Sequence, residues 1–267
     1  MKTNEFLAIL YITLLVISLL FFKPSKNKMV IDVLEKPNIS FYKEELKQEY
    51  KEYQQKTNYP LERVILDVNI GINKPFYKNN KETKYLNSPK MLVNKYHYLP
   101  KEYIPNNLID INEYTRSTLK MQKEAYDAFQ EMAKDALKEN IRIRIISAYR
   151  SYEYQEKLYN NYLKNDTVEK VDSYSARPGF SEHQTGLAID IDNIVNNYNN
   201  FHLTKEYNWM QNNAHLYGFI LRYPLGKERI TGYKYESWHY RYVGRDIAKY
   251  IHDNQITYEE YYAMFLE

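Results

Sequence analysis

Two short segments of the chain place histidine and carboxylate side chains at spacings suited to a metal ion. His183 and Asp190 stand on either side of Gly186, which can let the chain turn sharply enough for them to converge. Further along, Glu236 precedes His239 by three residues in an aromatic setting, close to the start of a predicted strand. Two histidines and one carboxylate are typical protein ligands of a catalytic zinc ion, and a further glutamate can take a proton from the attacking water. These residue types predict a hydrolytic zinc site.

The composition narrows the chemistry further. The chain has 267 residues and no cysteine, which excludes thiolate metal sites, disulfides and cysteine nucleophiles. Its 37 basic and 34 acidic residues leave a net charge of only +3, so no nucleic-acid partner is expected. With only 7 glycines, it carries no glycine-rich phosphate loop. Any metal must therefore be held by histidines and carboxylates.

Other candidate ligands fit the pattern less well. Asp192 lies two residues after Asp190, on the same face of a strand, and competes with it as a ligand. For the remaining four histidines we expect surface or simple hydrogen-bonding roles: His97, His202, His215 and His252.

Alternating apolar residues predict the strands that would position these side chains. Strands are indicated at residues 141–145 and 188–191 and from Trp238 onward. Residues 64–70 alternate in the same way, and Gly71 would end that strand.

Helical patterns lie between the predicted strands. They cover residues 113–139, 151–163 and 207–217, and one or two short helices are expected after Arg245. A narrower apolar stripe predicts another short helix within residues 41–56. Because helices and strands mix without a regular βαβ repeat, we expect an α+β fold.

Three segments, in this order, resemble the zinc D,D-carboxypeptidases of the VanY type. SAYRSYEYQ at 147–155 is similar to the family segment S-x-Y-R-x-x-x-x-Q. SEHQTGLAID at 181–190 and ESWH at 236–239 match S-x-H-x-x-G-x-A-x-D and E-x-W-H at every position. Residues 91–100 look like the segment that opens the catalytic domain in this group, which includes VanX dipeptidases, LdcB-type L,D-carboxypeptidases and the Sonic hedgehog fold. The resemblance implies a small antiparallel sheet with flanking helices and the zinc site on the sheet.

The resemblance also implies a role for each matched residue. His183, Asp190 and His239 would bind Zn²⁺, and the motif spacing selects Asp190 over Asp192. Glu236 would be the general base and later the acid that delivers a proton to the leaving amine.

Other matched residues would contact the substrate. Arg150 would face the carbonyl oxygen or the terminal carboxylate, for which a guanidinium is better suited than an ammonium group. Gln155 and Ser181 would hydrogen-bond the terminal residues of the substrate. Trp238 is expected to pack beside the site.

The function implied by the resemblance is removal of the C-terminal D-alanine from peptidoglycan stem peptides. An L,D-carboxypeptidase acting on tetrapeptide stems shares the same motifs, and an endopeptidase that cuts cross-bridges is a further alternative. A non-catalytic cell-wall-binding module could keep the zinc ligands but lose the base, so the presence of Glu236 argues against it.

The N-terminal segment predicts a membrane helix. Residues 6–22 are apolar except for Thr13 and Ser18, which is near the lower length limit for a membrane span. Phe21 to Pro24 fit a signal-peptidase site poorly, so an uncleaved anchor is favoured over a cleaved signal peptide or a buried helix. The expected organisation is an anchor or signal segment at 1–25, a polar stalk at 26–60 and a carboxypeptidase domain at 61–267.

The orientation of the anchor follows from the implied substrate. Lys23, Lys26 and Lys28 follow the apolar run and would favour a cytoplasmic location for the rest of the chain. The positive charges of Lys2 and the amino terminus favour the opposite orientation. Stem peptides lie outside the cytoplasmic membrane. We therefore expect a single-pass protein of the cell membrane with an extracellular catalytic domain. The sequence does not determine the oligomeric state, and a monomer is the expectation.

Overall fold

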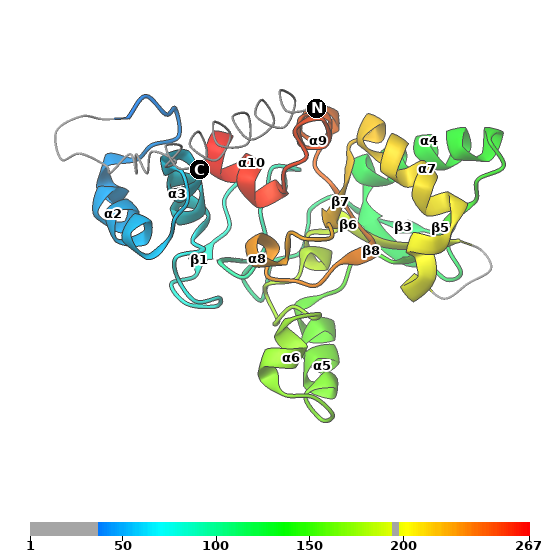
Figure 1. Cartoon of the computed structure of the whole chain (residues 1–267). Coiled ribbons are helices and arrows are strands. Elements are labelled where there is room, and N and C mark those ends of the chain that lie inside the picture. The colour runs from blue at the N-terminus through cyan, green and yellow to red at the C-terminus, as the bar shows by residue number, and fades with distance from the viewer. Residues whose placement is uncertain (1–36, 194–197) are drawn as a thin grey trace, which may run out of the picture.

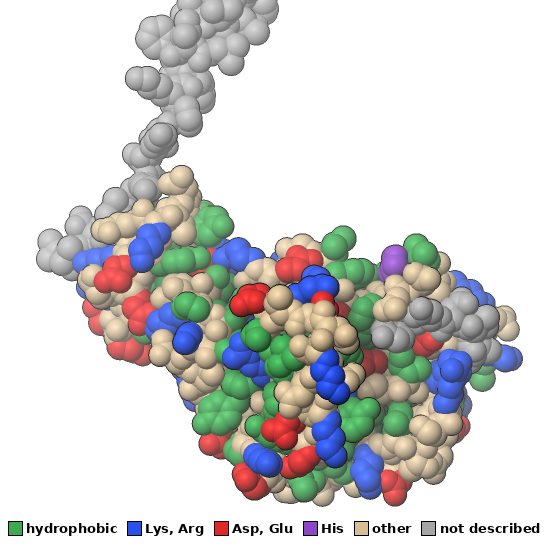
Figure 2. Space-filling model, turned by 90° about the horizontal axis from the view of Figure 1, so that it is seen from below, with side chains coloured by type: hydrophobic (Ala, Val, Ile, Leu, Met, Phe, Trp, Pro, Cys, Tyr) green, Lys and Arg blue, Asp and Glu red, His purple; other side chains and the backbone are tan. Residues whose placement is uncertain are grey.

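A computed structural model describes residues 37–193 and 198–267 of the chain (Figure 1). The expected membrane helix lies outside these described residues. Within them, no helix is both long enough and apolar enough to cross a bilayer. The described part is a mixed fold of small sheets and helices. On the face shown in Figure 2, basic and acidic side chains are interspersed and do not gather into a patch of one sign.

A four-stranded antiparallel sheet lies at the centre of the fold, in the strand order β5-β6-β8-β7. The strands are β5 (Ile143–Ser147), β6 (Ala188–Asn193), β7 (Phe219–Tyr223) and β8 (Glu236–Tyr242). The predicted antiparallel sheet is confirmed, and so are the strands expected at 141–145, 188–191 and from Trp238. In the pairing of β6 with β8, Asp190 lies directly opposite His239.

The main core packs the sheet against α4 (Lys123–Lys138). Phe129 and Met132 of α4 are fully buried with Ile189 and Ile191 of β6. The helix predicted for 113–139 is therefore correct only in its second part.

The first part of that segment forms a strand. Residues Leu119–Gln122 are β4, which pairs with β3 (Leu108–Ile111). Tyr114 has a left-handed φ of 61°, which a continuous right-handed helix cannot include. The helix therefore begins only after Gln122.

The segment predicted as a strand at 64–70 is a helix, α3 (Leu61–Ile70). The alternation is misleading because the residues between the apolar ones are buried as well. Among them, Asp67 pairs with Arg229, and Asn69 accepts a hydrogen bond from the Tyr50 hydroxyl. Gly71 does end the element, but with a φ of 98°, as a helix cap.

Before α3 lie a short 3₁₀ helix η1 (Glu44–Leu46) and α2 (Lys47–Lys56), which is the helix predicted within 41–56. Tyr50 of α2 packs against Val64 and Ile65 of α3. On its other side α3 meets α10 (Tyr258–Phe265), where Arg63 pairs with Glu260 at 2.5 Å. Ordered packing thus continues on the N-terminal side of residue 61, while the division into stalk and domain remains a prediction.

The remaining elements surround this framework. Figure 1 shows α5 and α6 standing out from the sheet as a small lobe. The helix predicted at 151–163 is α5, with Ser151 accepting the capping hydrogen bond, and the one at 207–217 is α7 followed by η4. The bounds are β1 (Lys81–Glu82), β2 (His97–Tyr98), α5 (Tyr152–Tyr162), α6 (Val168–Asp172), η2 (Glu182–Thr185), η3 (Tyr198–Leu203), α7 (Lys205–Asn213), η4 (Ala214–Tyr217), α8 (Glu228–Thr231) and α9 (Arg245–Asn254).

Gly186 makes the turn that the sequence predicts between His183 and Asp190. It ends η2 with a φ of 67°, and its N–H donates to the His183 carbonyl oxygen. A Cβ at this position would lie 2.8 Å from Leu108 Cδ2 and 3.2 Å from Gln122 Cγ. The turn therefore needs glycine both for its backbone angle and for the space around it.

We predict that Gly186→Ala destabilises the protein more than Gly226→Ala does. Both glycines have positive φ, but a Cβ at Gly226 would meet nothing within 4 Å. The left-handed backbone costs about 1–2 kcal/mol in either variant, and overpacking at Gly186 should add about 1–3 kcal/mol. Denaturant unfolding of both variants measures the difference. Equal losses of unfolding free energy would show that Leu108 and Gln122 can move away from the added Cβ at little cost.

Candidate metal centre and active site

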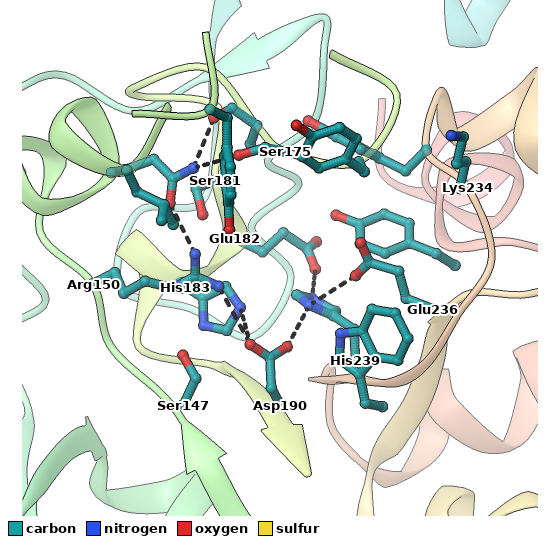
Figure 3. Close-up of a pocket in the computed structure, with 18 of the residues that line it drawn as sticks. Ser147, Arg150, Ser175, Ser181, Glu182, His183, Asp190, Lys234, Glu236 and His239 are labelled. Atoms are coloured by element: carbon teal, nitrogen blue, oxygen red, sulfur yellow. Dashed lines mark hydrogen bonds and ion pairs between the residues drawn. The ribbon is translucent and has the colours of Figure 1, made fainter. Parts of the chain in front are cut away.

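Three side chains from different elements converge at one end of the sheet (Figure 3). His183 comes from η2, Asp190 from β6 and His239 from β8. Asp190 Oδ2 lies 3.3 Å from His183 Nε2, and Asp190 Oδ1 lies 3.1 Å from His239 Nδ1. The structure thus brings together the three predicted metal ligands, whose ligand atoms all lie within 4.8 Å of one another.

The local fold explains this convergence. Residues directly opposite in an antiparallel pair project to the same face, which brings the side chains of Asp190 and His239 together. His183 reaches them because the Gly186 turn folds η2 back over the end of β6. The His183 Nδ1–H donates to the Ala148 carbonyl oxygen at 2.6 Å, which leaves Nε2 facing Asp190.

The three residues fit a zinc ion. Ligands at about 2.0–2.1 Å in a tetrahedron lie roughly 3.3 Å apart, and each of the two histidine nitrogens lies 3.1 or 3.3 Å from an Asp190 oxygen. His183 Nε2 and His239 Nε2 are both buried and make no hydrogen bond within the described part of the chain; the first faces Asp190 and the second faces Glu182. Burial and the nearby Arg150 lower the pKa of His183 to about 4, so its ring is neutral. Burial works to raise the pKa of Asp190, but His183 and His239 hold it well below its usual range.

Glu236 lies beside the ligand atoms. Its Oε2 is 3.7 Å from His239 Nδ1, and the side chain lies at the start of β8. Burial raises the pKa of Glu236 to about 7, with a further contribution from the charge of Asp190 and opposition from His239. A carboxyl group titrating near neutrality next to a metal site is suited to moving a proton.

Arg150 and Gln155 form a second part of the site. Arg150 Nη2 lies 3.4 Å from Asp190 Oδ2, and Nη1 donates to Gln155 Oε1 at 3.0 Å. The Gln155 amide nitrogen in turn donates to the Ala176 carbonyl oxygen at 2.7 Å. Gln155 therefore holds the guanidinium of Arg150 in place.

These residues line one cavity of about 670 Å³, a size typical of small-molecule sites. Ser181 lies in its wall, and Trp238, expected beside the site, lines it too. The rest of the wall is rich in tyrosine and includes one lysine: Tyr154, Tyr174, Tyr223, Tyr233, Lys234 and Tyr235. A partly apolar ligand with a polar end suits this lining.

A buried ionic network that was not predicted from the sequence lies behind His239. Glu182 and Glu259 accept hydrogen bonds from Arg222, and Glu182 also accepts one from Arg241. Burial works to raise the pKa of Glu182, but the two arginines hold it well below its usual range. One signal was available for Arg222, which stands in a strand, β7, that is otherwise apolar and aromatic.

Other clusters do not compete for the metal. Asp192 lies 3.9 Å from Arg144 and does not join the ligand group. A second group consists of His215, His252 and Asp253. The two imidazole rings there stack 3.6 Å apart at 7°. This second group is half-buried or exposed, whereas His183 and His239 of the first group are buried.

We predict one zinc ion per chain at the first group. His183→Ala and His239→Ala each remove a ligand and should lose most bound zinc, whereas His215→Ala and His252→Ala should keep it. Metal analysis after dialysis, with folding checked by circular dichroism, measures this. Full zinc retention in both ligand variants would rule out the site.

Comparisons with known proteins agree with the site. A family model, VanY: D-alanyl-D-alanine carboxypeptidase, matches residues 118–245. YodJ of Bacillus subtilis (strain 168) is 42% identical over 179 residues, which cover 64% of this chain and 66% of YodJ. The chain thus spans just under two thirds of that relative.

Two solved structures are similar as well. The LdcB LD-carboxypeptidase matches with a TM-score of 0.62 and 40% identity, over 66% of this chain and 87% of LdcB. A mutant of the vancomycin resistance D,D-pentapeptidase VanY, solved in complex with Zn(II), matches with a TM-score of 0.56 and 30% identity, over 65% of this chain and 98% of that one. The fold, the His–Asp–His group and these relatives agree: the chain belongs to the VanY family of D-alanyl-D-alanine carboxypeptidases.

Proposed function

We propose that the protein is a zinc-dependent D,D-carboxypeptidase that removes the C-terminal D-alanine from peptidoglycan stem peptides. The observation that carries this proposal is the position of Glu236, 3.7 Å from a ligand nitrogen of the His183–Asp190–His239 group and inside a peptide-sized cavity. The zinc-bound VanY structure and the peptidoglycan recognition described for LdcB support the metal and the substrate class.

The proposed chemistry divides among a few side chains. His183, Asp190 and His239 would hold the zinc ion. A zinc ion there would polarise the scissile carbonyl and make the attacking water more acidic. Glu236 takes the proton of the attacking water and later delivers it to the leaving amine.

The environment of Glu236 suits both halves of this task. Without a bound cation its pKa is raised to about 7 by burial. A nearby cation favours the carboxylate and lowers this value, so the group is a base at neutral pH. Since the carboxyl is buried, it can still accept a proton more readily than an exposed glutamate and release it again.

Arg150 is the proposed partner of the substrate's negative charge. Its guanidinium lines the cavity beside Asp190 and is held by Gln155. A fixed guanidinium suits a carbonyl oxygen that gains charge or a terminal carboxylate. Both ends of the Gln155 amide already have protein partners, so we propose that Gln155 acts through Arg150. Ser181 remains a proposed direct contact of the terminal residues.

An L,D-carboxypeptidase is the second candidate. The identity to LdcB, 40%, exceeds the identity to the VanY structure, 30%, with a higher TM-score as well. The two activities differ in the configuration of the residue before the scissile bond, while the metal and base chemistry is the same. A non-catalytic wall-binding module is disfavoured, because such a module has no need for a buried glutamate beside the ligands.

The substrate class also supports a location. Because stem peptides lie outside the cytoplasmic membrane, we propose that the catalytic domain is extracellular and that residues 6–22 anchor the protein to the cell membrane as a single span. A monomer is sufficient in this proposal, since all proposed site residues come from one chain.

We predict that Glu236→Gln lowers kcat about 10²–10⁴-fold with zinc retained, because the amide keeps the shape of the side chain but cannot take a proton. The exposed Glu153 at the start of α5 supplies a control, and Glu153→Gln should keep near wild-type activity. Release of alanine and metal content are measured for each variant. A Glu236→Gln enzyme that keeps more than about a tenth of the wild-type rate would contradict the general-base role.

A muropeptide panel tests the choice of bond. Purified zinc-loaded protein is incubated with pentapeptide, tetrapeptide and cross-linked stems, and the products are identified by mass. Loss of one alanine from the pentapeptide alone is the expected result. Cleavage of the tetrapeptide would favour the L,D reading, and separation of cross-linked stems would indicate an endopeptidase. If the protein binds the stem peptides tightly but cleaves none of them, the result would indicate a non-catalytic cell-wall-binding module.

A further inference from the structure

Glu182 lies behind the proposed metal site, between two buried arginines and His239. Its side chain is fully buried, and its two carboxylate oxygens face in different directions (Figure 3). Oε1 accepts hydrogen bonds from Arg222 Nε at 2.9 Å and Arg241 Nη1 at 3.0 Å. Oε2 lies 3.5 Å from His239 Nε2, and neither of these two buried atoms makes a hydrogen bond within the described part of the chain. Glu182 therefore connects a buried pair of arginines to one of the proposed zinc ligands.

The two nitrogens of His239 face different partners. Nδ1 lies 3.1 Å from Asp190 Oδ1, on the side of the proposed metal, while Nε2 lies on the side of Glu182. A neutral imidazole carries its proton on only one nitrogen, and the other nitrogen keeps the lone pair that binds a metal. Which nitrogen is protonated at His239 thus decides whether it can be a ligand.

We propose that Glu182 is a positioning residue that keeps the His239 proton on Nε2, so that Nδ1 is free to bind the metal. This inference rests on the zinc site of the proposed function. A carboxylate that accepts the outer N–H of a ligand histidine fixes the tautomer and the ring orientation and makes the ligand more basic. The two arginines prevent the Glu182 carboxylate from turning away.

The contrast with His183 supports this assignment. His183 carries its proton on Nδ1, which donates to the Ala148 carbonyl oxygen at 2.6 Å, and presents Nε2 to Asp190. The two histidines therefore offer opposite nitrogens, and each needs its own acceptor on the far side of the ring. A backbone carbonyl accepts the proton of His183, and the Glu182 carboxylate, 3.5 Å from Nε2, is the acceptor that faces His239.

The arginines also predict what an amide would do at position 182. In Glu182→Gln, the amide NH₂ cannot face the two guanidinium donors, so the carbonyl oxygen must turn to Arg222 and Arg241. The NH₂ group then faces His239 Nε2, which becomes an acceptor, and the ring proton moves to Nδ1. This tautomer cannot bind a metal through Nδ1.

Glu259 offers a matched control. It is as buried as Glu182 and accepts two hydrogen bonds from Arg222, at 2.9 and 2.5 Å. No hydrogen bond or ion pair joins it to His239 in the described residues. Glu259→Gln therefore removes the same charge from the same arginine without touching the zinc ligand.

The experiment compares zinc affinity of wild type, Glu182→Gln and Glu259→Gln by competition with a chromogenic chelator, with thermal unfolding recorded for each metal-free protein. We expect about 10–100-fold weaker zinc binding in Glu182→Gln and a change of less than about threefold in Glu259→Gln, although both lose thermal stability. Equal affinities in the two variants would overturn the inference. Absence of zinc binding by the wild type would instead refute the metal site itself.

A measurement on the wild type covers the case in which Glu182→Gln fails to fold. In zinc-loaded wild type, long-range ¹H–¹⁵N NMR spectra of the imidazoles should show His239 protonated on Nε2 and His183 protonated on Nδ1. A His239 proton on Nδ1, or protons on both of its nitrogens, would overturn the inference.

Discussion

The antiparallel pairing of β6 with β8 is the constraint on which the site depends. It sets Asp190 opposite His239, and a slip by one residue would turn one of them to the other face of the sheet. The register is held by packing, since Ile189 and Ile191 of β6 and Tyr240 of β8 are completely buried. The hydrophobic core that packs against the sheet thus sets the distance between Asp190 and His239.

The cavity combines two kinds of support. The metal-binding side chains stand on or next to the sheet, whereas Arg150 lies just before α5 and Gln155 lies within α5. The lobe of α5 and α6 is tied together through Asp172, which accepts hydrogen bonds from Tyr159 and Arg177. The reacting end of a substrate would therefore contact side chains on or next to the sheet. The rest of the substrate would lie along side chains of the α5 and α6 lobe.

The site could be predicted from sequence better than its surroundings could. The ligands lie in short segments whose order, spacing and strand patterns are local properties of the chain. Helix α3 was missed because Asp67 and Asn69 look like exposed residues until Arg229 and Tyr50 are placed beside them. Glu182 was missed for the same reason, since its arginines lie 40 and 59 residues further along the chain.

The buried group of Glu182, Arg222, Arg241 and Glu259 has a consequence for evolution. Removal of any one member leaves an uncompensated charge in the protein interior, which is far more costly than replacing the whole set with apolar residues. A variant with only one of these four residues replaced would therefore fold poorly. The four positions should therefore be inherited together, and a lineage that replaced all four would also need another acceptor for the outer nitrogen of His239.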